Sequence, residues 1–158
     1  MNYLLLYFFA IILSFSIIGH GYLLSKIINK DLLNFNLCYQ GLLGIYFTIF
    51  FTKHGYVHNI ILHVIGVSSF IYFLRKKKIY SELNKLIIIF TILFIGLLII
   101  VNHDDFNYYH LTYSLGLTEN KIFFGLGHFS HGYTHHSSLF FFNSIIFLPF
   151  IKFYLFHS

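Results

Sequence analysis

The run Leu86–Val101, LIIIFTILFIGLLIIV, decides the fold, because none of its side chains carries a charge. A helix of that composition approaches the thickness of a bilayer's hydrocarbon core, about 30 Å. Four further apolar runs share this character, although the second is short. We therefore predict an all-α fold, a polytopic transmembrane helix bundle of about five membrane helices. The predicted helices occupy residues 3–25, 35–52, 57–74, 85–101 and 138–155.

The composition excludes an ordinary soluble domain. Charged residues make up 9 % of the chain and hydrophobic residues 58 %, whereas about 25 % of the residues are charged in a typical soluble protein. The net charge of +5 does not indicate nucleic-acid binding, because the basic residues flank apolar runs. The single cysteine, Cys38, excludes a disulfide framework and a thiolate metal site. We expect the lipid bilayer as a partner, no nucleic acid, and other membrane helices as further partners.

The distribution of lysine and arginine predicts the orientation in the membrane. The loop Arg75-Lys76-Lys77-Lys78, between the third and fourth helices, is expected to face the cytoplasm. Helix alternation then puts the N-terminus and residues 102–137 outside. Eight of the ten basic residues fall inside (Lys26, Lys30, Arg75, Lys76, Lys77, Lys78, Lys85 and Lys152), and two fall outside (Lys53 and Lys121). We predict a multi-pass protein of the inner (plasma) membrane.

This pattern divides the chain into three regions. Residues 1–101 form four transmembrane helices, residues 102–137 form an external acidic and histidine-rich loop, and residues 138–158 form the fifth transmembrane helix. Pro149 lies inside the fifth run. Because proline has no amide proton, we expect it to kink or shorten that helix.

A pair of carboxylates, Asp104 and Asp105, follows the fourth helix directly. A carboxylate at the bilayer centre costs about 2.5–3.5 kcal/mol, so both side chains should lie at or beyond the membrane surface. Such a pair suits general-base catalysis or the binding of a divalent cation such as Mg²⁺ or Mn²⁺. The alternative is a pair of solvated residues that ends a helix.

The residues that follow predict an amphipathic helix lying in the membrane plane. A helix over 105–117 gathers polar residues on one stripe and apolar residues on another. The polar stripe comprises His103, Asn107, His110 and Ser114, and the apolar stripe comprises Phe106, Tyr109, Tyr113 and Leu117. We expect the polar stripe to face the protein. A plain amphipathic connector is the alternative.

Histidines gather in the rest of the external loop. His128, His131, His135 and His136 have spacings that can bind a metal. Chance also produces such spacings in a chain with 11 histidines. A metal site at His131, His135 and His136 and a set of unconnected histidines therefore both remain open.

Other polar residues have simpler interpretations. Ser137-Ser138 suits the N-cap of the fifth helix. His54 and His58 lie near the outer face, on the same side as the acidic loop. His20 and His63 lie within predicted helices, where we expect them to hydrogen-bond to neighbouring helices.

Between residues 100 and 150 several motifs follow one another. An apolar helix precedes Asp105-Phe-Asn-Tyr-Tyr-His-Leu111, a D-x-x-x-Y-H-L segment, and then come Gly125-Leu-Gly127, Ser137-Ser138 and a Phe- and Leu-rich helix. This order resembles the first large external loop of GT-C type polytopic glycosyltransferases, and a group of bacterial membrane proteins with the same segments. Family members are longer, so the resemblance implies the N-terminal portion of such an enzyme, or an incomplete copy.

The resemblance also implies a reaction. GT-C enzymes transfer a sugar from a polyprenyl-phosphate donor to an acceptor on the extracytoplasmic face, many of them with a divalent cation. By position, Asp105 or Asp104 would act as the base on the acceptor hydroxyl, with Asp105 favoured because it is nearer the Tyr-His-Leu segment. The same two carboxylates would hold the cation. The implied substrate-binding residues are Asn107, Tyr109, His110 and His128.

Two other classes of protein remain open. His131-x-x-x-His135-His136 resembles a histidine box, which implies a membrane metal-dependent oxidase or hydroxylase. The other class is a non-enzymatic polytopic subunit or metal-handling protein, in which histidines are ligands or link helices. Bound iron or zinc would favour these two classes, and loss of sugar transfer in Asp105→Asn would favour the transferase.

Overall fold

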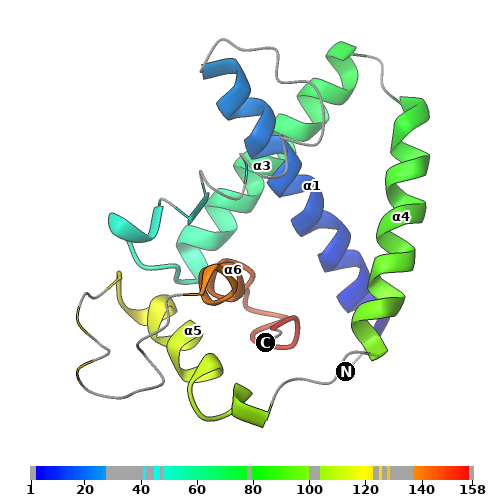
Figure 1. Cartoon of the computed structure of the whole chain (residues 1–158). Coiled ribbons are helices and arrows are strands. Elements are labelled where there is room, and N and C mark those ends of the chain that lie inside the picture. The colour runs from blue at the N-terminus through cyan, green and yellow to red at the C-terminus, as the bar shows by residue number, and fades with distance from the viewer. Residues whose placement is uncertain are drawn as a thin grey trace. The chain divides into compact units, whose positions relative to one another are not determined.

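The computed structural model describes residues 3–27, 41, 45–46, 48–77, 80–99, 104–122, 125, 128 and 137–156. Within these ranges the regular structure is helical, and the β-type pairing is an isolated bridge between Leu148 and Lys152. The elements are α1 (Tyr3–Ile27), η1 (Thr48–Phe50), α3 (Tyr56–Lys77), α4 (Tyr80–Ile99), η2 (Asp104–Phe106), α5 (His110–Glu119) and α6 (Ser138–Ile145), as Figure 1 shows. The all-α prediction is confirmed for this part of the chain.

The chain divides into two compact units. Unit 1 contains residues 1–44 and 62–101, and unit 2 contains residues 45–61 and 102–158. α3 belongs to both, because its first turns lie in unit 2 and the remainder in unit 1. Each unit is described by itself below.

Within the described part of the chain, two helices are long and apolar enough to cross a membrane, Tyr3–Ile27 and Tyr56–Lys76. A third span would exist if Leu83–Ile99 and Asp104–Glu119 counted as one. Only 33 % of the apolar window of each of the first two helices is buried in the structure. So much exposed apolar surface is stable against hydrocarbon and unfavourable in water. The chain is therefore a membrane protein.

Three of the predicted runs form long helices. The runs 3–25, 57–74 and 85–101 correspond to α1, α3 and α4, whose ends differ from the predicted ones by a few residues. The run 35–52 lies largely outside the described residues, and its end forms η1 and the bend after it.

The helix in the fifth run is much shorter than predicted. α6 contains eight residues, a rise of about 12 Å, which is less than the roughly 30 Å of a hydrocarbon core. Turns follow it up to Leu155. Pro149 accounts for the early end, because it has no amide proton for the carbonyl of Ile145 and disfavours helical backbone at Leu148. The predicted cap is present, since the Ser137 hydroxyl accepts a hydrogen bond from the Leu139 amide at 3.2 Å.

In unit 1, α1 and α3 cross at a pair of glycines (Figure 1). A Cβ atom on Gly19 would overlap the carbonyl oxygen of Gly66, and one on Gly66 would overlap both the hydroxyl and the carbonyl of Ser16. Without side chains here the two backbones come into direct contact, as in membrane helix pairs that pack through small residues.

Two histidines beside this crossing link the same helices. His20 Nε2 lies 2.9 Å from the carbonyl oxygen of Leu62, and His63 Nδ1 lies 3.0 Å from the hydroxyl of Ser16. The prediction that these two histidines hydrogen-bond to a neighbouring helix is confirmed.

α4 packs along the first half of α1 through aromatic side chains. The hydroxyls of Tyr7 and Thr91 are 2.6 Å apart. The Tyr7 ring lies edge-on to Phe94 at 5.3 Å, and Phe15 lies edge-on to Phe90 at 6.2 Å. A polar link and aromatic contacts therefore hold α4 on α1.

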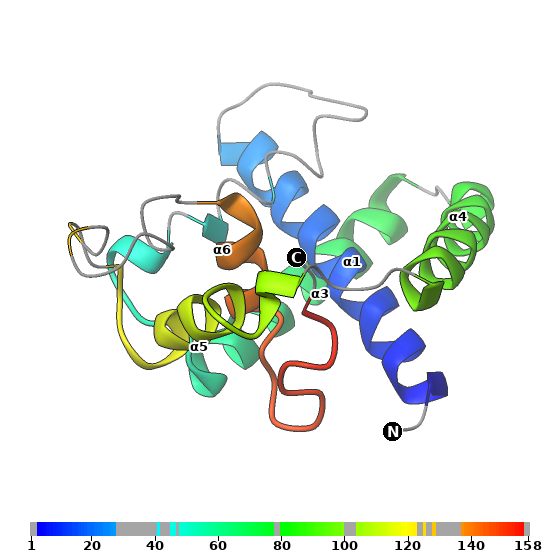
Figure 2. The same ribbon diagram turned by 60° about the horizontal axis from the view of Figure 1, so that its bottom comes forward.

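In unit 2, α5 and α6 lie side by side (Figures 1 and 2). Their contact is built from the buried side chains of Ile49, Tyr113, Leu117 and Phe140. Tyr113 and Phe140 have ring centroids 5.1 Å apart. Residues that the sequence separates widely thus form one apolar core.

Candidate functional site

The acidic pair Asp104 and Asp105 forms the 3₁₀ turn η2, a few residues beyond the end of α4. The carbonyl oxygen of Asp105 accepts hydrogen bonds from the amides of Tyr108 and Tyr109 at 3.1 and 3.2 Å. The buried ring of Phe106 anchors the turn. The Asp104 side chain is exposed and that of Asp105 is half-buried. Both carboxylates are therefore attached to an ordered backbone turn.

α5 begins at the Tyr-His pair of the D-x-x-x-Y-H-L segment. Tyr109 is its N-cap residue, and His110 is its first residue. The two rings lie edge to face at 4.2 Å, and the His110 ring lies 5.1 Å from that of Phe140 on α6. Both side chains are half-buried. Packing against α6 therefore fixes where this pair stands relative to the acidic turn.

The predicted continuous helix over 105–117 is wrong in two respects. A turn interrupts it between η2 and α5, so Asn107 is exposed and lies outside the helix. The apolar stripe also does not form an outer face: Tyr113 and Leu117 lie in the core of unit 2, and Tyr109 packs against that core. The large rings find apolar partners in α6, which the sequence does not reveal.

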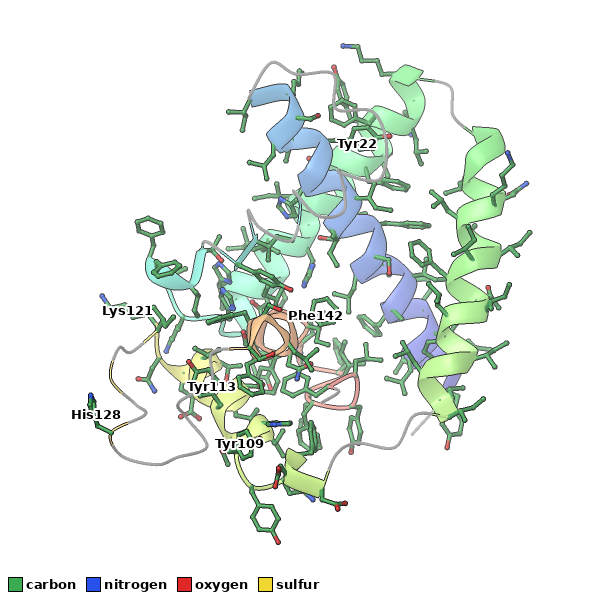
Figure 3. The ribbon with its side chains drawn as sticks, viewed as in Figure 1. Tyr22, Tyr109, Tyr113, Lys121, His128 and Phe142 are labelled. Carbon is green, nitrogen blue, oxygen red and sulfur yellow. The ribbon has the colours of Figure 1, made fainter. Side chains whose placement is uncertain are left out.

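The histidine-rich segment is described only in part. His128 is exposed, and its amide donates a hydrogen bond to the carbonyl of Gly125 at 3.1 Å. His128 and Lys121 both lie in the segment after α5, beyond Tyr109 and Tyr113 (Figure 3). His103, His131, His135 and His136 lie outside the described residues.

Among the residues that the structure describes, no three histidine, cysteine or acidic side chains come together as a metal site. Asp104 and Asp105 are hard oxygen donors of the kind that Mg²⁺ and Mn²⁺ prefer. Mg²⁺ commonly uses one or two protein carboxylates and takes its other ligands from water and substrate phosphate. The pair therefore fits a cation shared with a phosphorylated substrate better than a fully protein-bound one.

A second polar cluster lies at the end of the loop before α3, around the fully buried His54. Its Nδ1 is 2.8 Å from the Ser144 hydroxyl on α6, and its Nε2 is 3.0 Å from the Thr48 hydroxyl. The ring of His58 stacks on it at 5.1 Å. Each hydroxyl oxygen also lies within hydrogen-bond distance of a backbone carbonyl oxygen, Ser144 of Phe141 and Thr48 of Ile45, at 2.8 and 2.7 Å.

Burial and the neighbouring His58 lower the pKa of His54 from 6.5 to about 3. An imidazolium in this position would lose its hydration and would be repelled by a second positive charge. His54 is therefore neutral at physiological pH. It acts as a structural hydrogen-bonding group, a role that the sequence interpretation did not assign to it.

Asn59 completes this cluster and was missed from the sequence. Its Nδ2 group donates to the carbonyl oxygens of His54, Ser144 and Phe147 at 2.8, 2.8 and 2.9 Å. Its Oδ1 lies 3.1 Å from His58 Nδ1. Because three carbonyls surround the amide nitrogen, its oxygen must face His58, so His58 Nδ1 carries the proton. The sequence feature that could have pointed to this role is an asparagine at the start of an otherwise apolar helix.

A cavity of about 820 Å³ opens beside this cluster, entirely within unit 2. The loop before α3, the first turns of α3, the end of α5 and Phe147 surround it. The His54 amide donates to the Leu117 carbonyl at 2.9 Å, which holds the loop on α5. The polar side chains that line the cavity are Thr52, Lys53, His58, Thr118 and Glu119.

Comparison with known proteins does not identify this chain: no family model, curated protein or solved structure matches it.

Proposed function

We propose that this chain is a membrane-embedded glycosyltransferase-like protein of the GT-C type. It would transfer a sugar from a polyprenyl-phosphate donor to an acceptor on the extracytoplasmic face of the plasma membrane. The observation that carries the proposal is an ordered acidic turn, Asp104–Phe106, followed after the turn at 107–109 by helix α5, which has Tyr109 as its N-cap and His110 as its first residue.

The geometry of this turn agrees with the roles that the resemblance implies. Asp105 precedes Tyr109 by one short turn, and the backbone carbonyl of Asp105 accepts a hydrogen bond from the backbone amide of Tyr109. Carboxylate, phenol and imidazole groups therefore arise from one rigid stretch of backbone. Rigid placement of this kind favours proton transfer and acceptor orientation.

In the proposed reaction, the Asp105 carboxylate takes the proton of the acceptor hydroxyl. The acceptor oxygen forms a bond to the anomeric carbon of the sugar, and the bond from that carbon to the phosphate oxygen breaks. The polyprenyl phosphate leaves with the electron pair. Asn107, Tyr109 and His110 would orient the acceptor. A divalent cation, when held by Asp104 and Asp105, would neutralise charge on the phosphate.

Asp105→Asn is the test of this proposal. The amide keeps the shape of the side chain and cannot act as a base, so we expect sugar transfer to fall by about 10²–10⁴-fold, the usual contribution of general-base catalysis. Transfer is measured with a radiolabelled polyprenyl-phosphate sugar in membranes containing the chain and any partner it requires. Asp104→Asn is the matched control for charge, and we expect a smaller loss from it. Equal activity of wild type and Asp105→Asn would refute the proposed base.

The same proposal requires that the acidic turn face away from the cytoplasm. The charge bias of the sequence supports this orientation, with Arg75 and Lys76 at the opposite end of α3 from Lys53. Single cysteines replacing Asn107 and Arg75, in a Cys38→Ser background, should react with a membrane-impermeant maleimide in intact cells only at position 107. Labelling at position 75 alone would refute the orientation.

A further inference from the structure

The cavity beside α3 combines two kinds of surface. Its polar part is contributed by Lys53, His58 and Glu119, and its apolar part by Val57 and Ile61. Val57 and Ile61 are 73 % and 55 % exposed, and they lie in the first two turns of α3. The cavity therefore continues from charged groups onto an open apolar helix face.

The position of this cavity along α3 matches a membrane boundary. The candidate span begins at Tyr56, so Lys53 precedes it by one short loop, while Val57 and Ile61 lie inside it. Lysine is stable at the interface and unfavourable within hydrocarbon. A ligand that fills the cavity must therefore be polar at one end and apolar at the other.

The polar groups specify what the ligand's head must contain. Lys53 brings a positive charge beside the first turn of α3, where backbone amides lack partners within the helix and the helix dipole is positive. These features favour phosphate. In a neutral His58 ring the proton lies on Nδ1, toward Asn59, and Nε2 is then a hydrogen-bond acceptor. Glu119 is an acceptor too. Acceptors beside a phosphate site fit hydroxyl groups attached to that phosphate.

We propose that this cavity binds the head group of a membrane phospholipid whose phosphate carries a hydroxylated substituent. Lys53 binds the phosphate, His58 Nε2 and Glu119 accept hydrogen bonds from the hydroxyls, and the acyl chain lies along Val57 and Ile61. This inference stands apart from the proposed transferase activity, because it concerns binding alone and uses none of the residues of the acidic turn.

The test uses the full chain in phosphatidylcholine nanodiscs, with phosphatidylglycerol as the probe and native mass spectrometry to count bound lipid. Phosphatidylglycerol should bind saturably to wild type. Lys53→Ala should weaken it by about tenfold, as expected for one charge-assisted hydrogen bond. Lys121→Ala removes the same charge from the segment after α5, outside the residues that line the cavity, and should change the affinity less than twofold.

Two further variants test the apolar flank and the hydroxyl acceptor. Ile61→Trp should obstruct the cavity and reduce binding, whereas Ile65→Trp, one turn further along α3 and also exposed, should not. Glu119→Gln should weaken phosphatidylglycerol binding, because it loses a strong acceptor. The five side chains replaced in this test are all exposed, so folding should persist, and circular dichroism checks this.

Several results would overturn the proposal. Equal losses in Lys53→Ala and Lys121→Ala would indicate general surface attraction. Tighter binding in Glu119→Gln would mean that the carboxylate only repels the head group. Competition by millimolar inorganic phosphate, together with no effect of Ile61→Trp, would assign the cavity to a free anion.

Discussion

Replacing Asn59 with leucine should destabilise unit 2. The amide donates to the carbonyl oxygens of His54, Ser144 and Phe147, and these come from the loop before α3, from α6 and from the turn after α6. Leucine has a similar size but donates nothing. Three carbonyls would therefore lose their donor in a buried setting, where water cannot replace it.

The magnitude follows from the hydrogen bonds. A neutral hydrogen bond contributes about 0.5–1.5 kcal/mol. The two protons of the amide nitrogen serve three acceptors, so one proton is shared and the set is worth about 2–3 kcal/mol. Leucine is a better helix former than asparagine by a few tenths of a kcal/mol, which offsets little. We expect a net loss of about 2–3 kcal/mol in the free energy of unfolding.

Unfolding in mixed micelles on titration with sodium dodecyl sulfate, followed by far-ultraviolet circular dichroism, measures this loss. Asn84→Leu is the matched control, because Asn84 is exposed on α4, and it should change the free energy by less than about 0.5 kcal/mol. Asn59→Asp keeps the shape but brings an oxygen toward the carbonyls, so it should be at least as damaging as leucine. A folded Asn59→Leu protein within about 0.5 kcal/mol of wild type would refute the role given to the amide.

Two other perturbations test packing and protonation. Gly19→Ala should destabilise the α1–α3 crossing by at least about 2 kcal/mol, because the new Cβ atom meets the Gly66 backbone. The control, Gly96→Ala on α4, has no atom within 4 Å of the new Cβ and should stabilise the protein by about 0.5–1 kcal/mol. The same detergent titration measures both variants, and equal effects would contradict the close crossing at Gly19. The pKa of His54 is about 3 in the folded protein and 6.5 in the unfolded chain. When the pH falls from 6.5 towards 3, only the unfolded chain therefore binds a proton at His54. Stability should therefore drop by about 2 kcal/mol between pH 6.5 and 5, and His54→Gln should lose this component; an unchanged pH dependence in that variant would contradict the assignment.

The long helices were predictable because their signal is local. α1, α3 and α4 each contain a long, mostly apolar run without Lys, Arg, Asp or Glu, a signal that requires neither a partner nor a particular register. The end of α6 was less predictable. Pro149 marked a disturbance, but only the structure shows that the helix stops at Ile145 and that turns follow it.

The polar cluster around His54 could not be predicted, since its partners are distant in sequence. Ser144 lies 90 residues beyond His54, and 85 beyond Asn59. A pattern along the chain records which residues are polar, but not which of them meet. The acidic turn was partly predictable, less so than the long helices and more so than the cluster around His54. The sequence located Asp104 and Asp105 after a helix, while the separate start of α5 depends on packing against Phe140.

The imidazole of His54 has consequences for where protons can reside. A neutral ring has one N–H group, yet it stands between two hydroxyls, each of which also has a carbonyl within 2.8 Å. If Ser144 and Thr48 both donate to their carbonyls, both ring nitrogens must donate as well, and that would require a cation. One of the two hydroxyls must therefore donate its hydrogen bond to the His54 ring, or share its proton between the ring nitrogen and the backbone carbonyl. The cluster accordingly admits two tautomeric arrangements, with the hydrogen on Nδ1 in one and on Nε2 in the other.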